Sequence, residues 1–462
     1  MILKNALMYT DGSLRKGALL IHNGTIKSVV NEKSKEDLKK IRSHNEDGIE
    51  IDCEKRMVLP GIIDIHSHLR DMGQSEKETF LTGTLAAAFS GITTVFNMPN
   101  TIPPAINAYQ VKKWMEKAQN NIYVNVGFIA GVPRGFDFDE IISIIDLGVI
   151  GFKIYPIGPL NEIDWINYLN VQKILNISSK LQIPIFIHPD WLLSSEEKEK
   201  IYENYTLEPF PTLELHNKLY PVSMEAKYVN FVLENYYKII VDLDLSPKDY
   251  PIVHFCHISC KNSYSLIQKA LDTNNNLKIS FEITPHHLFL TNKIKISNPN
   301  YGKVLPPLRD EGHSLYLFKE LKEGRISLIG TDHAPHTLEE KGRGYLDAPS
   351  GFPGFETYPL TLLDKVYRDE LSLEKFVKIT SENPAKIFNL KNKGFVKEGY
   401  DADLVIVDKI PEYPIKSKKF KTKAKFSPFE DYKTAVQIWK VFLRGNEVNT
   451  EKSEPKGKII RM

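Results

Sequence analysis

The sequence has few cysteines and no long uninterrupted run of apolar residues. Only three cysteines occur among 462 residues, and their spacing forms no disulfide framework, which is typical of a reducing compartment. No stretch approaches the roughly 18 apolar residues that span a bilayer. The first residues also lack the apolar core and cleavage site of a signal peptide. We therefore expect a cytoplasmic protein with no membrane partner.

The sequence also lacks an excess of charge of either sign. The 60 Lys and Arg residues balance 58 Asp and Glu residues, which gives a formal net charge of +2. So balanced a charge predicts no nucleic-acid partner, and any charged ligand must be recognised by a local group of residues. The lysine-rich stretch at residues 416–425 is predicted to be a solvated loop.

Both ends of the chain carry short strand-like segments. Near the N-terminus, an Asn-Gly dipeptide at residues 23–24 separates two such segments, which is the pattern of a β-hairpin. Near the C-terminus, residues 402–407 and 437–443 are also strand-like. A small β-sandwich domain built from residues 1–56 and 391–462 would explain why both ends are β-rich.

The central part of the chain, residues 57–390, alternates strand-like and helix-like segments. Alternation of this kind predicts an α/β fold with parallel strands, and eight strand-like segments favour a closed (β/α)8 barrel of the TIM type. The predicted strands are residues 57–65, 93–98, 122–128, 149–154, 183–188, 252–257, 278–284 and 326–331. The clearest predicted helices are residues 76–89, 165–180, 224–238 and 262–271.

Side chains that bind metals stand at the ends of five predicted strands. The first strand ends with His66 and His68, and positions i and i+2 of an extended chain point the same way, so both imidazoles face one point. The other strand ends carry Lys153, His188, His257 and Asp332. Barrel enzymes have their sites at the carboxyl ends of the strands, so these residues are predicted to converge. Histidine nitrogen and carboxylate oxygen suit zinc and related divalent metals.

Lys153 can have either of two roles at such a site. As an ammonium it would repel a metal ion and would be an ion-pair partner for Asp332. Carboxylated by carbon dioxide, it would be an anionic ligand able to bridge two metal ions. The residues alone leave both roles open.

Three motifs around these residues resemble those of the dihydroorotase family of the amidohydrolase superfamily. The motifs are His66-Ser67-His68-Leu69-Arg70-Asp71, Asn97-Met98-Pro99-Asn100-Thr101 and Gly330-Thr331-Asp332-His333-Ala334-Pro335-His336. The likeness extends from about residue 59 to 387, and reappears at residues 427–430. The histidine pair and the aspartate mark the superfamily, whereas Arg70 and Asn100 are the more specific part.

The resemblance implies a zinc-dependent enzyme that reversibly hydrolyses dihydroorotate to carbamoyl aspartate in pyrimidine biosynthesis. The implied metal ligands are His66, His68, Lys153, His188, His257 and Asp332. Two zinc ions would be bridged by carboxylated Lys153, and Asp332 would be the catalytic base and then acid. Arg70, Asn100 and His336 would bind the substrate carboxylate. A homo-oligomer, and an association with aspartate transcarbamoylase, are further expectations from the same resemblance.

Several other residues near the motifs are not predicted to bind metal or substrate. His254 and Cys256 are predicted to be structural and packing residues that point away from the site. For His286 and His287, after the seventh strand, the sequence leaves open a structural role and a position facing the site. Leu305 replaces an asparagine that lines the substrate pocket in many family members.

Other functions stay open at this point. An allantoinase or hydantoinase would share the metal ligands, but its substrate lacks the carboxylate that Arg70, Asn100 and His336 are expected to bind. A non-catalytic scaffold for aspartate transcarbamoylase would typically have lost metal ligands, and none of the six is missing. A one-metal deaminase of the superfamily would lack the bridging lysine.

Overall fold

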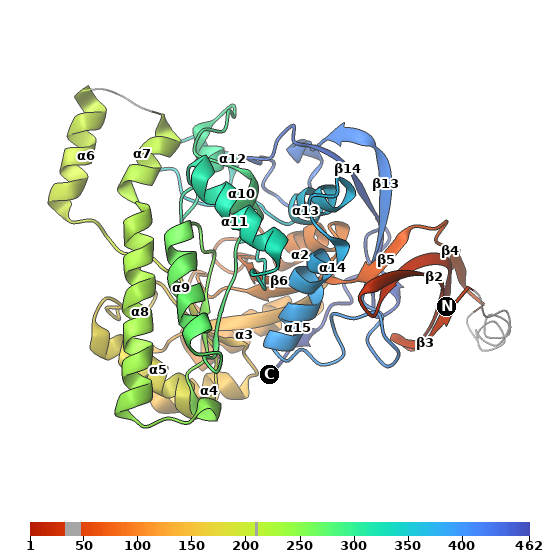
Figure 1. Cartoon of the computed structure of the whole chain (residues 1–462), viewed down its shortest axis with the longest axis horizontal. Helices are drawn as coiled ribbons and strands as arrows, with labels where there is room; N and C mark the ends of the chain where they lie inside the picture. The colour runs from red at the N-terminus through yellow and green to blue at the C-terminus, as the bar shows by residue number, and fades with distance from the viewer. Residues whose placement is uncertain (33–47, 208–210) are drawn as a thin grey trace.

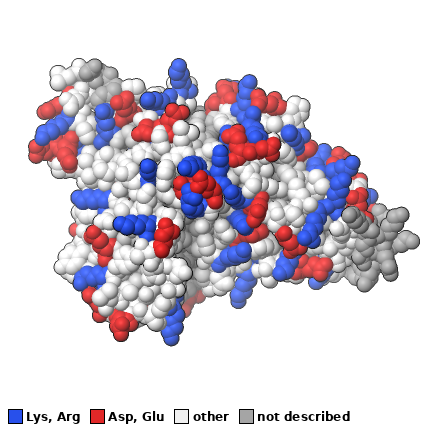
Figure 2. Space-filling model, in the orientation of Figure 1, with Lys and Arg blue, Asp and Glu red and all other residues white. Residues whose placement is uncertain are grey.

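The computed structural model describes residues 1–32, 48–207 and 211–462, whose strands form two sheets. One sheet is built from both ends of the chain and the other is the parallel sheet of a barrel (Figure 1). On the face shown in Figure 2, basic and acidic side chains are interspersed. No described helix combines the length and the apolar character that crossing a bilayer requires.

The terminal sheet has eight strands in the order β15-β14-β13-β5-β1-β2-β3, with β4 paired to β1. Their bounds are β1 Ile2–Thr10, β2 Ser13–His22, β3 Thr25–Asn31, β4 Glu50–Asp52, β5 Met57–Pro60, β13 Leu404–Pro414, β14 Lys433–Leu443 and β15 Asn446–Glu447. The hairpin expected at residues 23–24 joins β2 to β3. Leu3 and Leu19 from one end of the chain are buried with Leu404 and Phe442 from the other, so both ends share one apolar core.

The barrel sheet has seven regular parallel strands, in sequence order, and an irregular eighth segment. The strands are β6 Ile62–Ser67, β7 Ile92–Asn97, β8 Asn125–Gly131, β9 Gly151–Ile154, β10 Ile185–Ile187, β11 Val253–Phe255 and β12 Ile279–Phe281. The expected eighth strand at residues 326–331 pairs only through isolated parallel bridges, Ile283 with Ile329 and Ser67 with His333. Asp332 has a φ of 49°, which an extended strand cannot accommodate. The two bridges close the sheet, and the predicted TIM-type barrel is confirmed.

Most of the helices lie on the outside of the barrel and bury one apolar face, whereas α6 has no buried residue and projects away from the barrel (Figure 1). In α3 (Ala108–Ala118), the residues buried at helical spacing are Val111, Trp114, Met115 and Ala118, and Asn107 caps the first turn. The other helices are α2 Phe80–Phe89, α4 Phe138–Asp146, α5 Tyr168–Leu181, α6 Ser195–Leu207, α7 Thr212–Leu219, α8 Val222–Asp242, α9 Lys261–Thr273, α10 Pro285–Phe289, α11 Glu311–Glu323, α12 Leu338–Lys341, α13 Tyr358–Tyr367, α14 Leu373–Val377 and α15 Asn383–Ile387.

Two segments lie elsewhere than the sequence predicted. Residues 57–65 do not form one barrel strand, because β5 pairs with β1 and β13 in the terminal sheet and only β6 enters the barrel. Gly61 separates them where a Cβ atom would lie 2.2 Å from Oγ1 of Thr93, so the chain passes too close to its neighbour for a side chain. At the C-terminus, β16 (Ile459–Ile460) leaves the terminal part and pairs with β8 of the barrel.

The lysine-rich stretch at residues 416–425 is only partly a solvated loop. Most of its lysine side chains are exposed, but its backbone is bound to two carboxylates of the barrel. The N–H groups of Lys421 and Thr422 donate to Glu356 at 2.7 and 3.2 Å, and the Thr422 hydroxyl donates to Glu78. This stretch therefore joins the terminal part to the barrel.

We predict that Glu356 makes folding stability depend on pH. Burial raises the pKa of Glu356 from 4.5 to about 8, so the folded protein keeps a proton that the unfolded chain releases. The stabilisation is complete below the unfolded pKa and is lost as the pH rises through the folded pKa, by up to about 5 kcal/mol. Urea unfolding from about pH 5 to 9 should show a steeper loss of stability in the wild type than in Glu356→Gln, and equal slopes would contradict the prediction.

Candidate metal centre

A cavity of about 200 Å³ opens where the barrel strands end. The described residues that line it are His66, His68, Arg70, Asn100, Tyr155, Ile157, His188, His257, Val304, Leu305, Asp332, Ala334, Ser350 and Gly351. Seven of the nine residues predicted for the site are among them. The other two, Lys153 and His336, lie just behind the wall and contact it.

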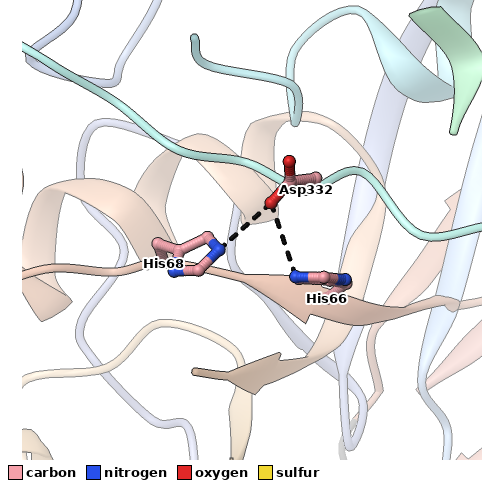
Figure 3. A group of neighbouring side chains, drawn as sticks. All are labelled: His66, His68 and Asp332. Carbon is pink, nitrogen blue, oxygen red and sulfur yellow. Dashed lines mark hydrogen bonds and ion pairs between the residues drawn. The ribbon is translucent and has the colours of Figure 1, made fainter. Parts of the chain in front are cut away.

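His66, His68 and Asp332 direct their side chains toward one another (Figure 3). Oδ1 of Asp332 lies 3.4 Å from Nε2 of His66 and 3.1 Å from Nε2 of His68. One donor atom from each of the three residues lies within 4.8 Å of the others. Two nitrogens and one carboxylate oxygen at this separation fit a divalent metal ion.

Oxygen acceptors behind the two histidines determine which ring nitrogen faces Asp332. Nδ1 of His66 is bonded to Oε1 of Glu282, and Nδ1 of His68 lies 2.6 Å from Oδ1 of Asn100. Each oxygen accepts the Nδ1 proton, so Nε2 is the ring nitrogen that faces the centre, as in metal-binding histidines generally. Glu282 was not predicted from the sequence, although a lone acidic residue in an apolar barrel strand was a signal that could have indicated it.

Glu282 is completely buried and is bonded to two further groups near the site. Besides His66, it accepts hydrogen bonds from the N–H of His257 at 3.1 Å and from Nε2 of His254 at 3.3 Å. Burial alone would raise the pKa of Glu282, but the imidazole of His66 lowers it well below its usual range. Burial likewise opposes the charge on His66, but ionised Glu282 raises the pKa of that imidazole to about 10. Glu282 is therefore a permanent negative charge behind His66.

His188 and His257 lie next to His66. The ring centroids are 4.5 Å apart for His188 and His257, and 5.1 Å apart for His257 and His66. Burial, with His188 beside it, holds the pKa of His257 well below its usual range. Its Nδ1 is buried and has no hydrogen-bond partner in the described part of the chain. A neutral, unpaired imidazole nitrogen is what a metal ligand requires.

Lys153 lies on β9 behind these histidines and is almost completely buried. Its Nζ donates to Sγ of Cys256 at 2.7 Å and lies 5.2 Å from the ring centroid of Tyr155. No carboxylate of residues 1–32, 48–207 or 211–462 forms an ion pair with it, so the pairing with Asp332 left open by the sequence is not found. The amine thus stands beside the candidate metal ligands without an anionic partner.

Cys256 faces the site, contrary to the sequence prediction. That prediction assumed that strand alternation continues to His257, but β11 ends at Phe255 and His257 has a φ of 35°. Donor atoms of Cys256, His66 and Glu282 also lie within 4.8 Å of one another. The thiol is therefore part of the polar surroundings of Lys153 and not only a packing group.

Arg70 brings a buried guanidinium to the rim of the cavity. Its Nε donates to the carbonyl oxygen of Pro335 at 3.2 Å, and one terminal nitrogen lies 3.2 Å from Nε2 of His336. Burial lowers the pKa of Arg70. Burial, together with the nearby Arg70 charge, holds the pKa of His336 well below its usual range, so this imidazole is neutral. No described carboxylate forms an ion pair with Arg70, so its charge is available to a ligand.

The structure also locates the residues whose roles were open. Tyr155 lines the cavity and has a buried hydroxyl without a described partner. Its position two residues after Lys153 could have indicated that it lies near the site. Leu305 lines the cavity as an apolar wall. His287 is bonded to Thr284 at 2.8 Å and to a backbone carbonyl, and neither His287 nor His286 lines the cavity.

Comparisons with known proteins agree with this geometry. Residues 55–152 match the Dihydro-orotase-like family and residues 232–448 the Amidohydrolase family. A dihydroorotase of Methanosphaera stadtmanae is 32% identical over 94% of this chain and 93% of its own length. A dihydroorotase of Pyrococcus abyssi is 34% identical over 99% of this chain and 96% of its own length.

Solved structures are similar over the whole chain. The L-hydantoinase (dihydropyrimidinase) from Arthrobacter aurescens superposes with a TM-score of 0.87 at 23% identity, over 100% of this chain and 99% of that chain. A D-hydantoinase from Thermus sp. superposes with a TM-score of 0.83 at 23% identity, over 100% and 98% of the two chains. At this identity, the likeness shows a shared fold.

Proposed function

The chain belongs to the dihydroorotase family, and on that basis we propose that it interconverts dihydroorotate and N-carbamoyl aspartate in pyrimidine biosynthesis. The observation that carries this proposal is the buried guanidinium of Arg70, which lines the same cavity as His66, His68 and Asp332. A guanidinium without an ion-pair partner favours a ligand with a carboxylate. Dihydroorotate has one on its ring, whereas hydantoin and allantoin have none.

We propose that the centre holds two zinc ions. The ligands would be His66, His68, Lys153, His188, His257 and Asp332, with Lys153 carboxylated by carbon dioxide. The support is the donor set itself, together with the unpaired Nδ1 of His257 and the amine of Lys153, which has no anionic partner among the described residues. When bound, the metal ions would polarise the ring carbonyl and lower the pKa of the attacking water.

In this proposal Asp332 transfers the proton. Burial opposes its charge, but His66 and His68 lower its pKa well below the usual range, so the carboxylate is ionised and can accept a proton. Asp332 would take the proton from the attacking water and deliver it to the ring nitrogen as the amide bond breaks. Asn100 fixes the ring of His68 through its side-chain oxygen, and its amide nitrogen has no described partner and is free to donate to the substrate.

Arg70 would hold the substrate so that the ring amide faces Asp332. Its fork of N–H donors matches the two oxygens of a carboxylate. His336 would act on the substrate through Arg70, because the imidazole contacts the guanidinium and not the cavity.

We further propose that the protein acts in the cytoplasm as a homo-oligomer, and that it associates with aspartate transcarbamoylase. Its three cysteines are free and buried, which fits a reducing compartment. We also propose that the terminal sheet is a domain of its own, with a first boundary at Pro60, where β5 ends, instead of residue 56.

Parallel assays of dihydroorotate, allantoin and hydantoin, with metal analysis of the same preparation, test the proposed function. Turnover of dihydroorotate alone, with about two zinc ions for each chain, is the expected result. Turnover of allantoin or hydantoin without dihydroorotate would contradict it. A protein that has no zinc, and no activity after zinc and bicarbonate are added, would instead be a scaffold.

A further inference from the structure

Two buried lysines lie beside the cavity and take no part in the chemistry proposed above. Lys303 follows a short 3-10 helix (Pro299–Gly302) and Lys341 ends α12; their exposed fractions are 7% and 0%. Lysines are rarely buried without an anionic partner. No carboxylate in the described part of the chain forms an ion pair with either ammonium, so another interaction must compensate for their burial.

Backbone carbonyls of the cavity walls compensate for the buried charge of Lys341. Its Nζ donates to the carbonyl oxygens of Pro349 at 2.8 Å, Gly351 at 2.9 Å and Lys303 at 3.4 Å. One ammonium therefore joins two chain segments that are far apart in sequence. Three charge-assisted bonds from one side chain make this junction rigid.

Lys303 makes a similar set of bonds to the same loop. Its Nζ donates to the carbonyl oxygen of Tyr345 at 2.5 Å and to that of Ala348. Its own carbonyl oxygen accepts the N–H of Gly351 at 2.9 Å. The loop at residues 345–351 is thus bound at several points by two ammonium groups.

The residues that these bonds hold are walls of the cavity. Val304 and Leu305 directly follow Lys303. Lys341 binds the carbonyl oxygen of Gly351 and that of Pro349, the residue before Ser350. The loop is closely packed there, because a Cβ atom on Gly351 would lie 2.7 Å from the carbonyl oxygen of Ala334. A displacement of either segment would therefore change the shape of the substrate site.

The same loop is connected to Arg70. The carbonyl oxygen of Ser350 lies 3.0 Å from Nε2 of His336, which lies 3.2 Å from the guanidinium of Arg70. We infer that Lys303 and Lys341 are positioning residues that fix the substrate-binding walls and, through Ser350 and His336, the guanidinium that receives the substrate carboxylate. The inference rests on the proposed function for its substrate.

Lys303, Lys341 and the backbone carbonyls that they bind are together called the clamp. The groups that surround the two ammoniums make the clamp sensitive to pH. The titratable groups that face them are Glu340, Asp347, Tyr345, His216 and His336. Burial, with Lys303 adding to it, lowers the pKa of Lys341 to about 7, and burial lowers the pKa of Lys303 to about 8. As the pH rises through this range, Lys341 loses one of the three protons that it donates to carbonyls, Lys303 loses the charge that strengthens its two bonds, and the loop loosens.

The variants Lys341→Met and Lys303→Met test the inference, with Lys319→Met on the exposed side of α11 as the matched control. KM for dihydroorotate should rise by about tenfold in each test variant, while kcat and zinc content stay within about twofold. Amide hydrogen exchange at residues 345–351 should become faster. Wild-type KM should rise with pH through the lysine range, whereas Lys341→Met should show a flatter profile. The control should match the wild type throughout.

Unchanged KM and unchanged exchange in both test variants would overturn the inference. Loss of zinc together with the rise in KM would also overturn it, because the lysines would then support the metal centre. If Lys341→Met fails to fold, Lys303→Met and the pH dependence of wild-type exchange at residues 345–351 decide the matter. If the wild type converts neither dihydroorotate nor carbamoyl aspartate, the proposed function fails, while hydrogen exchange still supports or overturns the clamp.

Discussion

Lys153→Ala is expected to lose most of its bound metal and at least about 1,000-fold in kcat, which corresponds to about 4 kcal/mol of transition-state stabilisation. The reason is the proposed carboxylated side chain, whose two oxygens would hold the metal ions together. Alanine leaves a gap beside Cys256 and Tyr155 where the amine now lies. Zinc analysis and steady-state kinetics on the same preparation measure both effects.

Two comparisons separate this loss from a general effect of the substitution. Lys180→Ala, at an exposed position of α5, removes a lysine without touching the centre and should keep full activity and zinc. Acetate or propionate added to Lys153→Ala should restore part of the zinc and activity, because a free carboxylate can occupy the gap. A variant with wild-type zinc and activity would show that Lys153 bridges nothing.

The convergence of the candidate ligands could be predicted because it depends on strand geometry. His66 and His68 are two positions apart at the end of β6, and that spacing alone directs both side chains to one side. His188 follows β10 and His257 follows β11, so the order of parallel strands brings them to the same end of the barrel. These placements need only the repeating geometry of strands.

Other features depend on irregular backbone, which no residue pattern specifies. Cys256 was expected to point away from the site, and it faces Lys153 because β11 stops at Phe255 and His257 turns with a positive φ. The eighth strand is reduced to two bridges for a similar reason at Asp332. Periodicity indicates the face of a residue only while the regular element continues.

Contacts between residues that are far apart in the chain also could not be predicted from the sequence. Glu282 reaches His66 across 216 positions, and Lys341 binds carbonyls whose direction depends on how the loop at residues 345–351 folds. A lysine in a polar stretch is typical of a solvated surface. Its complete burial follows from carbonyls that only the folded loop brings together.

Arg70→Ala is expected to raise KM for dihydroorotate about 100-fold and to leave the zinc content unchanged. Two charge-assisted hydrogen bonds to a carboxylate contribute on the order of 3 kcal/mol, which corresponds to that factor. The guanidinium contacts Pro335 and His336 and none of the candidate metal ligands, so the centre should assemble without it. Arg70→Lys should recover only part of the affinity, because an ammonium keeps the charge but not the fork of donors.

A substrate without the carboxylate isolates what Arg70 does. For dihydrouracil, which has the same ring amide but no carboxylate, Arg70→Ala and the wild type should have similar kcat/KM, since the guanidinium has nothing to bind. The ratio of kcat/KM for dihydroorotate to that for dihydrouracil should therefore fall by about 100-fold in the variant. An equal loss on both substrates, or a loss of zinc, would mean that Arg70 supports the rim through Pro335 and His336. The fall in the ratio would instead identify Arg70 as the group that makes this cavity specific for an acidic ring.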